Sequence, residues 1–276
     1  MSTRRVAACV TAFAVSIALL GCGSSDATST STTTTTPAAK VDPAMKRLAG
    51  RYAHYDVVAY DSTGLKNLII SYGFTDFSVK DGKLWAHESF CHADQVTDQP
   101  IKTVISDVAT SAIKPISIAV TLSTKDGKAR IQRAETPTGI GIKFANPATD
   151  KLPTDPNDPR IFDHDGDGHP GITVSIRTGP TGTGQLGEIY IARRERFAYD
   201  VSEQADHSLT GTVRDKSEQL IIAATSKAFV SRAEWKQYSD LTKSPIVLKP
   251  VAANWDCKKL MASAKDLFPF NPKVDW

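Results

Sequence analysis

Short β-type runs separated by turn residues dominate the chain from about residue 51 to residue 225. Residues 67–79 and 84–92, for example, flank Asp81-Gly82, which is the signal of a β-hairpin. Because tight turns join most of these runs, we expect a mainly β fold, an antiparallel meander that forms a sandwich or a barrel. The other predicted strands cover residues 51–60, 117–123, 129–133, 140–144, 172–177, 188–197, 209–213 and 219–225.

Three segments break this pattern, so we expect two or three short peripheral helices. Apolar residues at helical spacing predict one helix over residues 101–112. Ser231-x-x-Glu234 is a capping box, which predicts a second helix over residues 232–241. The third is predicted near the C-terminus, where one helical face would collect Cys257, Leu260, Met261, Ala264 and Phe268.

The N-terminus has the layout of a secretory signal. Two arginines precede an uncharged, mostly apolar run over residues 6–20, which is shorter than the ~20 apolar residues of a membrane-spanning helix. The run ends in Leu19-Leu20-Gly21-Cys22, which resembles the lipobox of bacterial lipoproteins. The resemblance implies a signal peptide over residues 1–21, cleavage before Cys22 and a lipid anchor on that cysteine. An ordinary signal peptide cut at another bond is the alternative.

A polar tether is predicted between the anchor and the folded part. Residues 23–39 are rich in Ser and Thr and hold nothing apolar to bury, so the tether, residues 22–43, is expected to be flexible. Residues 44–276 are long enough to form a single β-rich domain with one core. Gly23 stands where some enterobacterial lipoproteins carry an acidic residue that retains them in the inner membrane. The lipid anchor implies the cell envelope, and the resemblance at Gly23 favours the outer membrane in a Gram-negative host.

The charge balance argues against a nucleic-acid partner. The chain has 33 Lys and Arg against 30 Asp and Glu, and residues 1–21 contain two of the arginines and no acid. The mature domain is therefore nearly neutral, with no basic excess to release counterions from nucleic acid. The local cluster Arg193-Arg194-Glu195-Arg196 is predicted to lie on a solvated strand face.

Cys91 and Cys257 are predicted to form a disulfide. They are the two cysteines left in the mature chain if Cys22 carries lipid. Export would place them in an oxidising compartment, where disulfides persist. Two buried free thiols are the alternative.

The run from Asp163 to Gly168 carries the pattern D-x-D-x-D-G. It resembles the first half of an EF-hand-type calcium loop, as in dockerin and thrombospondin type 3 repeats. The resemblance implies a structural calcium held by Asp163, Asp165, Asp167 and the backbone carbonyl of His169.

The match to the EF-hand pattern is incomplete, because position twelve is Val174 instead of glutamate and a strand follows. A further ligand would have to come from elsewhere, and Asp155 and Asp158 are the nearest candidates. An Asp/Gly turn that caps its own backbone is the alternative. Residues 158–173 also resemble segments of uncharacterised exported β-rich proteins of proteobacteria, which implies export and no particular chemistry.

Two other patterns in the sequence are less informative about fold and function. Leu48-Ala49-Gly50-Arg51-Tyr52 resembles the start of lipocalin-type barrels but lacks the tryptophan usual there. Gly182-x-Gly184-x-x-Gly187 matches the dinucleotide fingerprint as a string, yet a strand is predicted after it where that fingerprint requires a helix. We therefore predict a hairpin loop at these glycines.

Two functions remain open at this point. The first is a membrane-anchored, non-enzymatic β domain that binds a small molecule or an envelope protein. The alternative is an exported, calcium-stabilised hydrolase acting on carbohydrate or ester substrates, since a catalytic triad can be dispersed through any sequence. A closed apolar cavity would favour binding, and a cleft with two carboxylates about 5–10 Å apart would favour hydrolysis.

Overall fold

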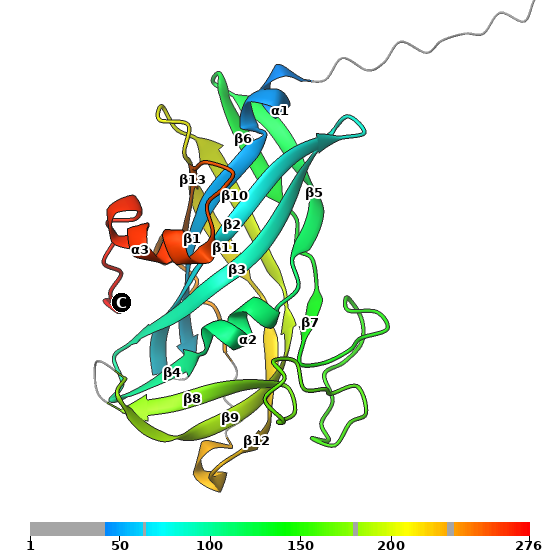
Figure 1. Cartoon of the computed structure of the whole chain (residues 1–276), viewed down its shortest axis with the longest axis vertical. Coiled ribbons are helices and arrows are strands. Elements are labelled where there is room, and N and C mark those ends of the chain that lie inside the picture. The colour runs from blue at the N-terminus through cyan, green and yellow to red at the C-terminus, as the bar shows by residue number, and fades with distance from the viewer. Residues whose placement is uncertain (1–41, 63–64, 179–181, 231–234) are drawn as a thin grey trace, which may run out of the picture. The chain divides into compact units, whose positions relative to one another are not determined.

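Eight strands form a closed antiparallel barrel in the computed structural model, which describes residues 42–62, 65–178, 182–230 and 235–276 (Figure 1). Each barrel strand pairs with the next one along the chain, and the first pairs with the last to close the ring. This neighbour order is that of an up-and-down barrel. The mainly β prediction is confirmed, and the meander forms a barrel instead of a sandwich. The strands are β1 (Gly50–Ser62), β2 (Leu65–Lys80), β3 (Lys83–Thr97), β5 (Ile116–Lys125), β6 (Lys128–Arg133), β10 (Phe197–Glu203), β11 (Leu209–Asp215) and β13 (Pro245–Pro250).

A second antiparallel sheet, which we call the cap sheet, is built from segments inserted between barrel strands. Its strands are β4 (Ile101–Ile105), β7 (Thr138–Ile140), β8 (Ile172–Thr178), β9 (Gly184–Glu195) and β12 (Glu218–Ala224). Their order is β12-β9-β8-β4, and β7 also pairs with β9. The cap sheet lies across the lower end of the barrel in Figure 1, so apolar side chains of the two sheets can meet there.

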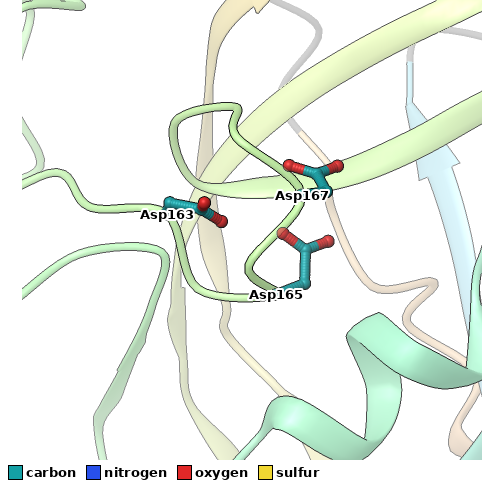
Figure 2. Close-up of side chains that lie close together, drawn as sticks. All are labelled: Asp163, Asp165 and Asp167. Atoms are coloured by element: carbon teal, nitrogen blue, oxygen red, sulfur yellow. The ribbon is translucent and has the colours of Figure 1, made fainter.

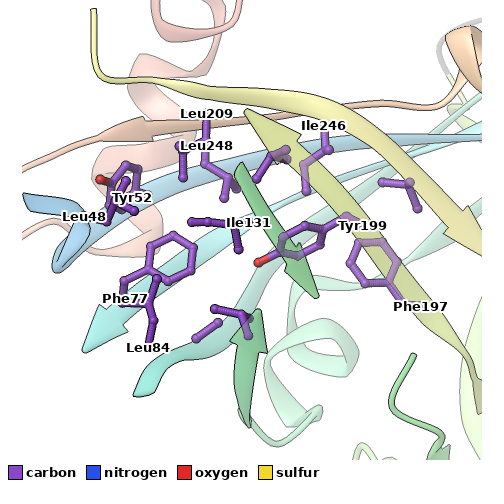
Figure 3. Close-up of a cluster of buried hydrophobic side chains, with 14 of the residues drawn as sticks. Leu48, Tyr52, Phe77, Leu84, Ile131, Phe197, Tyr199, Leu209, Ile246 and Leu248 are labelled. Carbon is purple, nitrogen blue, oxygen red and sulfur yellow. The ribbon is translucent and has the colours of Figure 1, made fainter. Parts of the chain in front are cut away.

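The middle of the barrel is packed with side chains. Along β1, Tyr52, Val58 and Tyr60 belong to the inner core, whereas Tyr55 and Val57 belong to a cluster on the outer face. This alternation is the two-residue repeat of a strand. The barrel is therefore a filled core and not a channel. Other inner residues are Leu48, Phe77, Leu84, Ile131, Phe197, Tyr199, Leu209, Ile246 and Leu248 (Figure 3).

The C-terminal helix was predicted and is confirmed as α3 (Cys257–Leu267). Asp256 caps its start by accepting a hydrogen bond from the backbone N–H of Lys259 at 2.8 Å. Its buried face contributes Leu260 to the outer cluster. The predicted disulfide is also present: Cys257 is bonded to Cys91 of β3, with their Cα atoms 5.3 Å apart. The disulfide and the apolar contacts together hold α3 against the barrel wall.

The prediction of a helix over residues 101–112 is wrong in its first half. Ile101–Ile105 is β4, an edge strand that pairs with β8 from Ile101↔Thr178 to Ile105↔Val174. The helix α2 (Asp107–Ala112) begins after Ser106, whose Oγ accepts from the backbone N–H of Ala109 at 3.0 Å. Apolar spacing fitted a helix, but β-branched residues with an available partner strand form a sheet instead.

The prediction of a helix over residues 232–241 is not borne out where the structure describes it. Its capping residues, Ser231 and Glu234, lie outside the described residues. Residues 235–240 are not helical, because Gln237 forms a β-bridge with Tyr60 and its side chain accepts from the backbone N–H of Asp215 at 2.8 Å. Two single 3-10 turns, η1 (Lys227–Phe229) and η2 (Leu241–Lys243), flank this region.

A short helix that was not predicted, α1 (Pro43–Leu48), precedes the barrel. Asp42 accepts from the backbone N–H of Ala44 at 2.8 Å, and Pro43 occupies the first turn, where its missing N–H costs no hydrogen bond. All described residues belong to one compact unit of the chain. The predicted signal peptide and Cys22 fall outside them. None of the described helices is long and apolar enough to cross a membrane.

Candidate ligand cavity and metal loop

A cavity of about 180 Å³ lies between the lower end of the barrel and the cap sheet. Ile69 of β2 and Phe90 of β3 form part of its barrel side, and Thr110 of α2 lines it as well. The cap side is an almost continuous apolar wall. That wall consists of Ile105 from β4, Ile140 from β7, Ile172 and Val174 from β8, and Ile189 and Ile191 from β9.

Strand alternation in β9 extends this wall into a pair of charged residues. Ile189, Ile191, Arg193 and Glu195 all line the cavity, whereas Ala192 packs in a separate cluster on the other face. The side chains of Arg193 and Glu195 each keep only 19% of their surface exposed. The prediction of a solvated strand face for this cluster is therefore wrong, because the cap sheet is covered on the side that these two residues face.

The charged end of the cavity is a hydrogen-bonded group from three strands. Arg193 Nε donates to Glu195 Oε2 at 2.6 Å, and Arg193 Nη2 lies 3.3 Å from Asp215 Oδ2 on β11. The hydroxyl of Tyr60 on β1 donates to the same carboxylate oxygen of Asp215. One guanidinium is thus shared by two carboxylates. We call these four residues the charged end.

Burial perturbs the titration of this group. Desolvation raises the pKa of Glu195, and the negative charge of Asp215 adds to the rise, although Arg193 opposes it. Burial also raises the pKa of Tyr60 well above its ordinary value. The pKa of Arg193 is raised despite its burial, because Glu195, Tyr60 and Asp215 all favour its charged form. Strongly shifted groups in a cavity are characteristic of functional sites.

A second buried network inside the barrel has the composition of a catalytic triad. His54 Nδ1 lies 2.9 Å from Thr75 Oγ1, and His54 Nε2 lies 2.9 Å from Asp56 Oδ1. Thr75 has no exposed surface, and burial raises the pKa of Asp56. A nucleophile must reach its substrate, and this hydroxyl is enclosed by the packed core. The arrangement satisfies buried polar groups and offers no site for catalysis.

The interior of the barrel also contains a buried ion pair. Arg133 is 1% exposed and donates from Nε and Nη2 to Glu88 Oε2 at 3.1 and 2.9 Å. Its Nη1 donates to the carbonyl of Ala134 at 3.1 Å and to that of Phe197. Sequence reasoning did not single out this pair, because its partners are 45 residues apart along the chain.

The three aspartates of the predicted calcium loop do come together. The carboxylates of Asp163, Asp165 and Asp167 each offer an oxygen, and these oxygens lie within 4.8 Å of one another (Figure 2). The turns between them depend on Gly166 and Gly168, whose φ angles of 75° and 89° favour glycine. The alternating spacing therefore places three hard oxygen donors on one side of a short loop, as a calcium ion would require.

Backbone hydrogen bonds already engage part of this loop. Asp163 accepts from the N–H groups of Gly166 and Gly168 at 2.7 and 2.9 Å, and these bonds lower its pKa. Asp165 Oδ1 is a buried oxygen with no hydrogen-bond partner. Burial and the neighbouring Asp167 and Asp163 raise the pKa of Asp165. The loop thus has the self-capping hydrogen bonds of an Asp/Gly turn. It also has a carboxylate whose ionised form a nearby positive charge would stabilise.

The other predicted ligands are placed as follows. His169 donates its N–H to Asp167 Oδ1 at 2.9 Å, and its ring stacks on Tyr190 with centroids 4.4 Å apart. Among the described residues, the acidic group contains neither Asp155 nor Asp158. Asp158 is paired with Arg160 at 2.8 Å, and Asp155 accepts from the backbone N–H of Asn157 at 2.9 Å.

The loop is attached directly to the cavity wall. The Nδ1 of His164 accepts from the N–H of Gly141 at 2.8 Å, so its Nε2 carries the proton and faces the carbonyl of Ala112 at 3.2 Å. A side chain on Gly171 would place its Cβ 2.3 Å from the carbonyl oxygen of Ile191. The loop therefore packs against α2 and β9, which both border the cavity.

The glycine string lies in a hairpin between β8 and β9, as predicted, but only Gly182 is in the connecting loop. Gly184 and Gly187 belong to β9 and pair with Thr178 and Ile176 of β8. Comparison of the chain with family models, with curated proteins and with solved structures finds no match.

Proposed function

We propose that this protein is an exported, lipid-anchored domain that binds a small, mainly apolar molecule in the cavity between the barrel and the cap sheet. The cavity itself is the observation that carries the proposal. A concave, mainly apolar space with a few convergent polar groups is the usual form of a ligand site. A bound molecule would sit on the isoleucine wall, with its polar part at the charged end.

The size of the cavity limits the ligand. A volume of about 180 Å³ is below the ~300–1,000 Å³ of sites for drug-sized molecules. It is close to an engineered cavity of about 150 Å³ that binds benzene. The ligand is therefore of the size of one ring or a short alkyl chain, and not a long acyl chain.

Filling the cavity tests the proposal. Val174→Phe places a ring in the space, whereas Ser175→Phe adds the same ring at the next position of β8, which does not line the cavity. We expect ligand-detected NMR to show binding of benzyl alcohol to the unaltered protein and to Ser175→Phe. Binding should be lost in Val174→Phe. Equal binding to both variants would refute the proposal.

The lipid anchor is part of the proposal and rests on the motif that ends in Cys22. Cys22→Ala is expected to move the protein from the membrane fraction to the soluble fraction, because a single substitution removes the acylated side chain. Continued sedimentation with membranes at unchanged abundance would contradict the anchor.

The proposal includes a calcium ion at the aspartate loop, with a structural role. The convergence of three carboxylates and the partnerless oxygen of Asp165 support it. Because the loop packs on β9, a cation there would stiffen one wall of the cavity. The alternative, an exported hydrolase, gains no support from the triad-like residues of the interior, since Thr75 is fully buried.

A further inference from the structure

The charge of the cavity lining indicates which kind of ligand it takes, and this inference rests on the proposed binding function. Among the described residues, three charged ones line the cavity: Asp94, Arg193 and Glu195. Asp94 is paired with Lys102. That leaves Arg193 to balance Glu195 and, behind it, Asp215. With all groups ionised, the charged end carries one excess negative charge.

An anionic ligand fits this arrangement poorly. A carboxylate or phosphate at the charged end would meet two carboxylates and one guanidinium, which already binds Glu195 at 2.6 Å and Asp215 at 3.3 Å. The ligand would add negative charge to a largely buried group that already carries an excess of it, which is unfavourable. The positive charge of the guanidinium is therefore already offset by the protein's own acids.

A cationic ligand would supply the positive charge that balances the charged end. Glu195 lines the cavity and keeps part of its surface open to it. An ammonium group at that carboxylate would neutralise the excess charge. Tyr60, Phe90 and Trp235 also line the cavity, and Tyr60 and Trp235 meet edge to face with ring centroids 5.5 Å apart. Aromatic faces, like carboxylates, attract organic cations.

We propose that the cavity binds a small organic amine, with its apolar group on the isoleucine wall and its ammonium at Glu195. The raised pKa of Glu195 agrees with this, because burial and Asp215 both disfavour its lone negative charge. A bound cation takes over the role that a proton otherwise plays at this carboxylate.

Three probes of matched shape test the proposal on the unaltered mature protein: benzylamine, benzyl alcohol and benzoate, measured by calorimetry at pH 7. We expect benzylamine to bind at least tenfold more tightly than benzoate, with benzyl alcohol between them. If benzyl alcohol or benzoate binds as tightly as benzylamine and Val174→Phe removes that binding, the cavity is a ligand site but the amine preference is wrong. If none of the three binds, the proposed function itself fails.

A charge-neutral variant locates the preference. Glu195→Gln should abolish the advantage of benzylamine over benzyl alcohol. Glu218→Gln is the matched control, because Glu218 pairs with Arg194 and is not part of the lining. It should keep the advantage in full. An unchanged advantage in Glu195→Gln would overturn the assignment of the ammonium to this carboxylate. The comparison of probes on the unaltered protein decides the proposal even if this variant does not fold.

Discussion

Removing the disulfide between Cys91 and Cys257 should lower the free energy of unfolding by about 2–5 kcal/mol. The bond spans 166 residues. In the chain-entropy model a loop of that length restricts the unfolded chain by about 5 kcal/mol at 25 °C. Measured effects are often smaller, because real unfolded chains retain structure. Cys91 is buried, so alanine is a better replacement than serine at this position.

The assay is urea denaturation of the mature protein and of Cys91→Ala/Cys257→Ala, with the free energy taken by linear extrapolation. Adding reductant should destabilise the unaltered protein and leave the double variant unchanged. A difference below about 1 kcal/mol between the oxidised unaltered protein and the double variant would refute the entropic reasoning. Labelling of both cysteines without reductant would remove its structural basis.

Three further predictions concern the interior, the loop and the pH dependence. Arg133→Met should lower the free energy of unfolding, measured by urea denaturation, by about 3–5 kcal/mol, because it leaves the buried Glu88 without its ion-pair partner. Adding Glu88→Leu should restore most of that stability, and an equal loss in the single and double variants would contradict this. Calcium at 100 times its dissociation constant should stabilise the protein by about 2.7 kcal/mol, and the effect should vanish in Asp165→Asn; an unchanged melting temperature would exclude a stabilising site. Arg47 lowers the pKa of Glu203 to about 2, so the stabilisation from this carboxylate is present above the ordinary glutamate pKa of about 4.3 and is lost as the pH falls toward 2. Glu203→Gln should flatten that decline in acid-unfolding curves, and identical curves would argue against the pair.

Features encoded locally were predictable from the sequence. The hairpin turns and the C-terminal helix follow from residues that are neighbours along the chain. The aspartate cluster belongs to the same class, because Asp163, Asp165 and Asp167 lie within one loop and alternate spacing suffices to bring them together. The disulfide followed from the small number of cysteines.

Features that depend on distant partners were missed. The segment 101–105 has helical spacing, but β8, some 70 residues later, converts it into a strand. Arg193 and Glu195 were predicted to be solvated. The barrel residues that cover them, and Asp215 of β11, are distant in the sequence, so the burial of the two side chains could not be predicted from their neighbours. The alternation of Ile189, Ile191, Arg193 and Glu195 on one strand face was the available signal. It shows that these charges share the face of two buried isoleucines.

The most direct test of the central claim is methyl NMR of the mature protein with labelled isoleucine side chains during titration with benzylamine. We predict saturable shifts of Ile172, Ile189 and Ile191, which line the cavity. Ile131 and Ile246 in the packed barrel core should remain in place. Shifts confined to surface residues, or no saturable shift at any isoleucine, would contradict a ligand site between the barrel and the cap sheet.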